Sequence, residues 1–131
     1  MTSNNHKQPE ILVVDDAFIN RMLLTDICTS IGCKCSAARN GEEALRACNE
    51  HDFDMVFLDI EMPVKNGFET ATAIRALEGA KSQTPIIALT AHNADEINDE
   101  LTEAGFTDII SKPFHISKIE RLVAEYCTAA L

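Results

Sequence analysis

A single apolar run that ends in a carboxylate is the most restrictive feature of this sequence. Residues 55–58 carry four apolar side chains in succession, with no polar residue between them. Such a run is typical of a β-strand buried on both faces, as in parallel sheets covered by helices on each side. Asp59 follows directly, and Pro63 and the Asn66-Gly67 pair then predict a turn. We therefore expect Asp59 at the carboxyl edge of a sheet, where ligands bind in open α/β folds.

Other short apolar runs have the same character, and they alternate with segments whose apolar residues recur at helical spacing. Strands are predicted within 10–16, 34–38, 54–59, 85–90 and 107–111, and helices within 18–31, 42–50, 67–77, 93–104 and 116–128. A polar connection is predicted at 79–84. The apolar stripe of the first helix consists of Ile19, Leu23, Ile27 and Ile31, with Leu24 and Cys28 beside it.

Five strands alternating with five helices predict an α/β fold, a doubly wound parallel sheet with helices on both faces. We expect a polar leader at 1–9 and one domain at 10–131. The carboxyl ends of parallel strands lie at one edge of the sheet. That edge should gather the polar residues that end or follow the strands, which are Asp15, Asp16, Asp59, Thr90 and Lys112.

The net charge of the chain limits the classes of molecule that it is expected to bind. The chain has 131 residues, 21 of them acidic and 11 basic, for a net charge of -10. This charge disfavours broad contact with nucleic acid or anionic membrane, so we expect partners to be proteins or cations. The sequence contains neither an apolar run of transmembrane length nor a secretory signal, which predicts a cytoplasmic protein.

The five cysteines, an odd number, do not form a recognisable metal or redox motif. Cys33 and Cys35 are the only close pair, and they lack the two-residue spacer of a zinc knuckle or a thioredoxin motif. On a strand they would face the same side but lie too far apart to bridge easily. We predict reduced cysteines that act as small buried apolar groups.

The polar residues predicted at the sheet edge have a defined chemistry. Three carboxylates close together repel one another unless a cation joins them. Oxygen ligands suit Mg²⁺, which uses one or two carboxylates together with waters and a phosphate. Lys112 would add a positive charge, and Thr90 a hydroxyl donor. These are the parts needed for Asp59 to accept a phosphoryl group.

In these motifs the chain resembles the response regulator receiver domains of two-component signalling, from about residue 10 to 126. Five motifs occur in the family's order, and the details are similar to receivers of hybrid histidine kinases. The motifs are Ile11-Leu-Val-Val-Asp-Asp16, Phe57-Leu-Asp-Ile-Glu-Met-Pro63, Asn66-Gly67, Ala88-Leu-Thr-Ala91 and Ser111-Lys-Pro-Phe114. The resemblance implies a flavodoxin-like sheet with strand order 2-1-3-4-5.

The resemblance also implies roles for the residues at the edge. Asp59 would be the phosphoacceptor, and Asp16, Asp59 and the backbone carbonyl of Glu61 would ligate Mg²⁺, with Asp15 acting mainly through water. Thr90 and Lys112 would bind the phosphoryl oxygens, and the Lys112-Pro113 bond is expected to be cis. The implied partners are a sensor histidine kinase or a histidine phosphotransfer protein, and a downstream protein target. Such a domain catalyses only its own phosphorylation and dephosphorylation.

Four positions near the site bear on how the domain would act. The family usually carries Tyr or Phe three residues before the lysine, where this chain has Ile109, so the usual threonine-aromatic coupling is in doubt. Phe106, in the preceding loop, is predicted to pack in the core. Glu61 and His92 occupy positions that tune the lifetime of the phosphate in the family, and we hypothesise the same role here.

Two other functions remain open from the residues alone. A haloacid-dehalogenase-like phosphatase also uses an aspartate, Mg²⁺, Thr and Lys, but it needs a second aspartate where this chain has Glu61. A flavodoxin-like electron carrier would need a Ser/Thr-rich phosphate loop after the first strand, which this sequence lacks. The sequence also leaves open whether the domain stands alone or belongs to a hybrid kinase.

Overall fold

The computed structural model describes residues 8–61, 66–91 and 94–127. Its strands are β1 (Glu10–Val14), β2 (Lys34–Ala38), β3 (Met55–Asp59), β4 (Ile86–Thr90) and β5 (Asp108–Ser111). Its helices are α1 (Phe18–Ser30), α2 (Gly41–Glu50), α3 (Gly67–Arg75), the 3-10 helix η2 (Gly79–Gln83), α4 (Ala94–Ala104) and α5 (Ile116–Tyr126). The predicted strands and helices are confirmed over the described residues. Most of the polar connection predicted at 79–84 forms the short helix η2.

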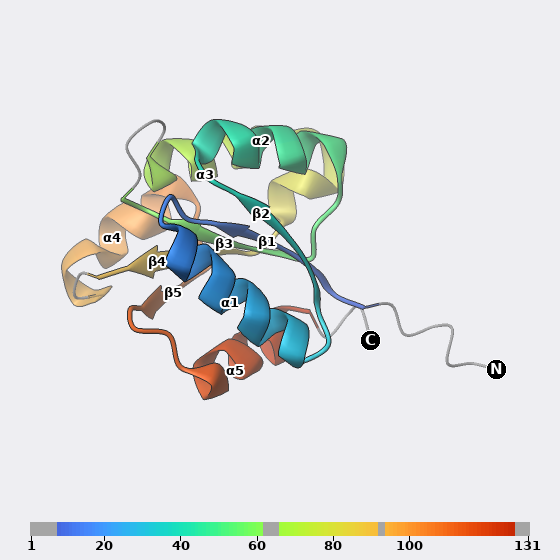
Figure 1. Ribbon diagram of the computed structural model, residues 1–131. Helices are drawn as coiled ribbons and strands as arrows, with labels where there is room; N and C mark the ends of the chain where they lie inside the picture. The colour runs from blue at the N-terminus through green and yellow to red at the C-terminus, as the bar shows by residue number, and fades with distance from the viewer. Residues whose placement is uncertain (1–7, 62–65, 92–93, 128–131) are drawn as a thin grey trace.

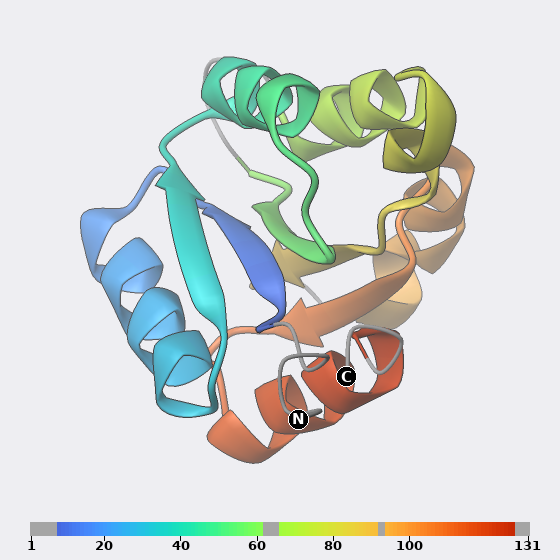
Figure 2. The same ribbon diagram turned by 90° about the vertical axis from the view of Figure 1, so that its right-hand side faces the viewer.

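The strands form one parallel sheet in the order β2-β1-β3-β4-β5. Figures 1 and 2 show α1 and α5 on one face of the sheet and α2 and α3 on the other. This arrangement confirms the doubly wound α/β fold and the strand order 2-1-3-4-5. It also places the carboxyl ends of all five strands at a single edge.

Both faces of the sheet are buried, which explains the uninterrupted apolar runs of the sequence. On β3, Phe57 packs in the cluster under α1 and α5, whereas Val56 and Leu58 pack in the cluster under α2 and α3. All five residues of β3 and of β4 are buried. Because these strands have no solvent-facing side, side-chain polarity changes only where a strand ends.

The predicted apolar face of α1 is only half correct. Leu24, Ile27 and Cys28 are buried, but Ile19 is 64% and Leu23 44% exposed. At 100° per residue, Leu23 is turned about 100° and Ile19 about 140° around the helix from Leu24. The apolar stripe of α1 is therefore wider than the part of the helix that packs against the sheet. The outer part of the stripe is exposed to solvent.

The start of α3 fixes the backbone that follows Asp59. Asn66 caps the helix: its Oδ1 accepts the Glu69 N–H at 2.9 Å, and Glu69 Oε1 accepts the Asn66 N–H at 3.2 Å. Gly67 lies so close to the end of β3 that a Cβ there would be 2.4 Å from Ile60 Cα and 2.7 Å from the Asp59 carbonyl oxygen. The predicted turn at Asn66-Gly67 is thus a helix start, while Pro63 lies outside the described residues.

Candidate functional site

The structure brings the predicted polar residues together at the carboxyl edge of the sheet. Asp15 follows β1, Asp59 and Thr90 end β3 and β4, and Lys112 follows β5. Carboxylate oxygens of Asp15, Asp16 and Asp59 lie within 4.8 Å of one another. Asp15 and Asp59 are buried, whereas Asp16 is exposed. The edge therefore carries a compact acidic cluster with both buried and accessible oxygens.

Asp59 is held in a fixed position and is hard to ionise. Its carboxylate Oδ1 accepts the backbone N–H of Glu61 at 2.9 Å, and the residue is 2% exposed. The pKa of Asp59 is raised from 3.8 to about 6, mainly by burial and also by the nearby charge of Asp15, although the Glu61 N–H and Lys112 act to lower it. A cation beside Asp59 would therefore stabilise its ionised form.

Asp15 is oriented by the loop that leads into α1. Its Oδ1 accepts the Ala17 N–H at 2.9 Å, and its backbone carbonyl accepts a hydrogen bond from Arg21 Nη1 at 2.9 Å. The Arg21 guanidinium also lies over the Phe18 ring, 5.7 Å from its centre. Arg21 positions the acidic loop, a role that the sequence did not predict and that its place one turn into the helix could have suggested.

Lys112 lies between the two buried carboxylates. Its Nζ is 3.5 Å from Asp15 Oδ2 and 3.5 Å from Asp59 Oδ2. Its backbone N–H donates to the Thr90 carbonyl oxygen at 2.8 Å, which joins the ends of β4 and β5. The Lys112-Pro113 peptide bond is cis, as expected.

The charges and donor atoms fit a divalent cation. Three carboxylates and one lysine leave two negative charges in the cluster when all are ionised. Asp15 Oδ2 is buried and has no hydrogen-bond partner within the described part of the chain, so it is available as a ligand. All candidate ligand atoms are oxygens, the donors that Mg²⁺ prefers.

The remaining predicted positions surround this cluster. The Glu61 side chain is exposed, and its effect on phosphate lifetime stays a prediction; His92 lies outside the described residues. Ile109 is half-buried and packs with Phe68 and Phe106 against a small cluster at the α4 side. Phe106 contacts Phe68 edge to face, with ring centres 6.0 Å apart, which confirms its core role.

Comparison with protein families gives one match across most of the chain. The model for the response regulator receiver domain matches residues 11–124. A curated relative is the sensor protein GacS of Pseudomonas syringae pv. syringae, 32% identical over 127 residues. The match covers 95% of this chain but only 14% of GacS. The chain thus spans about one seventh of that relative.

Solved structures of the same fold include two receiver domains. One is from the sensor histidine kinase PA1611 of Pseudomonas aeruginosa, with TM-score 0.85, 28% identity, and coverage of 93% of this chain and 99% of the other. That structure has a magnesium ion coordinated in its active-site cleft. The other is from Ssk1 of Saccharomyces cerevisiae, in complex with the histidine phosphotransfer protein Ypd1, with TM-score 0.85, 26% identity, and coverage of 95% and 92%.

A search of the described residues for membrane-spanning helices finds none that is long and apolar enough to cross a bilayer.

The raised pKa of Asp59 predicts a pH-dependent stability. In Mg²⁺-free buffer, a carboxyl whose folded pKa is about 6 rather than 3.8 contributes stability below pH 4 that is lost as the pH rises through 6. Asp59→Asn should therefore raise the free energy of unfolding at pH 7 by about 2–3 kcal/mol, with little change at pH 4. Urea denaturation at both pH values measures this difference.

The matched control is Asp16→Asn, because Asp16 belongs to the same cluster but is exposed. It should change the stability by less than about 0.5 kcal/mol at either pH. An equal gain in both variants would show that total charge, and not the burial of Asp59, sets the effect.

Proposed function

We propose that this chain accepts a phosphoryl group on Asp59 from a phosphohistidine protein. The chain belongs to the response regulator receiver domain family of two-component systems. The observation that carries the proposal is the juxtaposition of Asp59 with Asp15 and Lys112 at the end of β3, in which Lys112 Nζ is 3.5 Å from both carboxylates. The transfer forms an Asp59 oxygen–phosphorus bond and breaks the nitrogen–phosphorus bond of the donor histidine.

Each residue at the edge has a task in this transfer. The Glu61 N–H holds the plane of the Asp59 carboxylate, so the nucleophile does not need to be ordered as the donor arrives. Lys112 neutralises charge on the phosphoryl oxygens, and the Thr90 hydroxyl donates a hydrogen bond to one of them. Arg21 keeps Asp15 in place by donating a hydrogen bond to the backbone carbonyl of Asp15.

Asp15, Asp16, Asp59 and the Glu61 carbonyl are the residues that would hold Mg²⁺. When bound, the ion supplies charge neutralisation between the carboxylates and the incoming phosphoryl group. The proposal is supported by the oxygen donors of the cluster and by Asp15 Oδ2, which is buried and accepts no hydrogen bond from the described residues. The magnesium ion in the PA1611 receiver agrees with this assignment.

The reaction modifies the chain itself. Family members are generally phosphoacceptors without an outside substrate, and we infer that this domain catalyses only its own phosphorylation and dephosphorylation. The phosphatase alternative is not supported, because the family match is to receiver domains and the position of the phosphatase's general acid is Glu61.

The exposed part of the apolar stripe on α1 is the surface that we assign to the phosphodonor. We call it the α1 patch: Phe18, Ile19, Met22 and Leu23, which are 63%, 64%, 45% and 44% exposed. Ile116, at the start of α5, is 55% exposed, and α5 lies beside α1 on this face (Figure 1). The patch adjoins the carboxylate edge, since Phe18 follows Asp15 by three residues.

A phosphohistidine protein fits this patch for a geometric reason. Asp59 is almost fully buried, so a donor histidine must come to the edge itself, and the donor must then cover the surface beside it. Burial of exposed apolar side chains would stabilise that contact by roughly 25 cal/mol per Å². The receiver domain of Ssk1, which has the same fold, was solved bound to a histidine phosphotransfer protein.

Phosphorylation can be tested with a small donor such as phosphoramidate. With Mg²⁺, the wild-type chain should gain the mass of one phosphoryl group, and Asp59→Asn should gain none. Lys112→Met should slow the reaction about 100-fold, as expected when one charge-stabilising donor is removed. Intact-mass spectrometry over time measures all three. Asp26→Asn, an exposed carboxyl on α1, is the control; incorporation into Asp59→Asn at the wild-type rate would refute the assignment.

The α1 patch can be tested by comparing two donors. Ile19→Asp should slow transfer from a phosphorylated histidine phosphotransfer protein by at least about tenfold, which corresponds to a contact of 1.4 kcal/mol. It should leave the rate with phosphoramidate unchanged, because that donor needs no docking surface. Glu42→Ala, exposed on α2, is the control. Equal slowing with both donors would place the defect in the site and not in docking.

A further inference from the structure

The Arg21 side chain contacts both the acidic loop and the exposed surface of α1. Its Nη1 donates to the Asp15 carbonyl oxygen at 2.9 Å, and its guanidinium lies 5.7 Å from the centre of the Phe18 ring. Within the described part of the chain Arg21 forms no ion pair with a carboxylate, so the ring and the carbonyl are the partners of its guanidinium. One side chain therefore joins the α1 patch, to which Phe18 belongs, to the loop that precedes it.

The Asp15 carbonyl bears on the orientation of two carboxylates of the acidic cluster. It belongs to the planar peptide unit that joins Asp15 to Asp16, so its direction constrains how the two residues are turned relative to each other. Backbone groups hold the rest of the loop: Asp15 Oδ1 accepts the Ala17 N–H at 2.9 Å, and the Ala17 carbonyl accepts the Arg21 N–H at 3.0 Å. Arg21 thus holds this loop with both its side chain and its backbone.

The contact between Arg21 and Phe18 is open to solvent on the outer side of α1. Phe18 is 63% exposed, and Arg21 is half-buried. A groove of about 210 Å³ lies beside them, between α1 and β2. Its lining residues are Phe18, Arg21, Met22, Thr25, Asp26 and Ala37. A protein that covers the α1 patch would remove water from the ring and the guanidinium, and a cation–π contact is stronger when it is desolvated.

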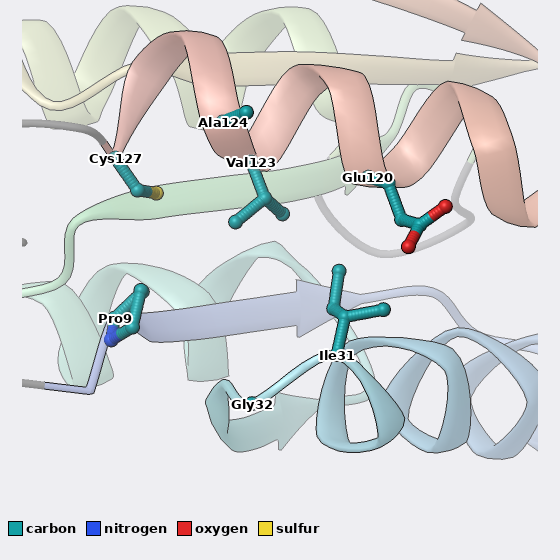
Figure 3. A pocket seen from close by; sticks show the side chains of 7 residues that line it. All are labelled: Pro9, Ile31, Gly32, Glu120, Val123, Ala124 and Cys127. Carbon is teal, nitrogen blue, oxygen red and sulfur yellow. The ribbon is translucent and has the colours of Figure 1, made fainter.

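The opposite end of α1 lies far from the acidic loop. A larger groove, of about 280 Å³, lies there between α5 and the C-terminal end of α1, and Figure 3 shows the side chains of Ile31, Val123 and Cys127 that line it. Glu120 is the one charged residue among its lining residues, and Cys127, like the other four cysteines, is a free thiol, as predicted. Ile31 is ten residues beyond Arg21, about 15 Å along the helix. A partner seated in this groove would therefore not contact the acidic loop.

We propose that Phe18 and Arg21 couple docking of the phosphodonor on the α1 patch to Mg²⁺ binding in the acidic cluster. The inference rests on the proposed function, since it needs both the donor and the metal assigned there. Docking buries the Phe18 ring, the ring holds the guanidinium more firmly, and the guanidinium fixes the Asp15 carbonyl. Asp15 and Asp16 are then held in the orientation that binds the ion. By thermodynamic linkage, bound Mg²⁺ raises the affinity for the donor by the same factor.

The Mg²⁺ affinity of an Arg21 variant separates positioning from simple electrostatics. Removal of a positive charge near the cluster would by itself strengthen Mg²⁺ binding. Arg21→Met should instead weaken it about tenfold, as expected when a group that orients a metal ligand is lost. Isothermal titration of Mg²⁺ at pH 7 measures the Kd. A Kd of Arg21→Met that equals the wild-type value or lies below it would overturn the proposal.

The aromatic ring is tested by a matched pair of substitutions. Phe18→Leu keeps an apolar side chain without a π face and should weaken Mg²⁺ binding about threefold, whereas Phe18→Tyr keeps the ring and should retain the wild-type Kd. In the Arg21→Met background, Phe18→Leu should have no further effect, because the ring acts through the guanidinium. Ile116→Ala, an exposed apolar position outside the α1 patch, is the control and should leave the Kd unchanged. Equal weakening by Phe18→Leu and Ile116→Ala, or none by Phe18→Leu, would refute the coupling.

Binding of the donor gives a second readout. The unphosphorylated histidine phosphotransfer protein used to measure transfer should bind the wild-type chain about fivefold more tightly with saturating Mg²⁺ than without it, and Arg21→Met should lose this difference. A donor affinity that does not depend on Mg²⁺ would overturn the coupling, while phosphoramidate would still label Asp59. If the wild-type chain failed to bind Mg²⁺ at all, the metal assignment of the proposed function would fail as well.

Discussion

The repulsion between buried carboxylates at the end of the central strands is the constraint on which the rest of the structure depends. Asp15 and Asp59 have lost almost all their water, and one lysine, 3.5 Å from each, provides a single positive charge between them. Such an arrangement is stable only if the surrounding backbone fixes every group. The N–H groups of Ala17 and Glu61 and the link between Lys112 and the Thr90 carbonyl provide that support.

Helix α1 connects this edge to the other features of the molecule. Its first turn orients Asp15 through Arg21 and exposes the α1 patch beside the acidic cluster. Its last turns carry Ile27 and Cys28, which are buried in the core cluster on this face of the sheet. A helix of 13 residues is about 20 Å long, so the acidic cluster and this buried anchor lie at opposite ends of one rigid element.

The sequence predicted the fold and the composition of the site well, because both depend on where buried strands end. Asp59, Thr90 and Lys112 each follow an apolar run, and a parallel sheet must bring such positions to one edge. The partners of these residues were less predictable. Arg21 acts on a backbone carbonyl, and Gly67 is required by a close approach to Ile60; neither relation leaves a periodic pattern.

The exposure of two other parts of the molecule also could not be predicted from residue spacing. Hydrophobic spacing gives the apolar stripe of a helix but not the width of the surface that covers it, so the spacing alone did not indicate that Ile19 and Leu23 are exposed. The cysteines were predicted to be buried, but Cys35 is half-buried, and its Sγ lies 3.9 Å from Thr29 Oγ1 and from the Thr25 carbonyl oxygen. These contacts join β2 to α1, and spacing along the chain does not indicate them.

We propose that the uncompensated negative charge at the sheet edge recruits a divalent cation. Isothermal titration of Mg²⁺ at pH 7 tests it most directly when the charge is changed in both directions. Asp15→Asn should weaken Mg²⁺ binding, whereas Lys112→Met, which removes the competing positive charge, should strengthen it. If both variants bind Mg²⁺ with the wild-type Kd, the acidic cluster is not the metal site and the account is contradicted.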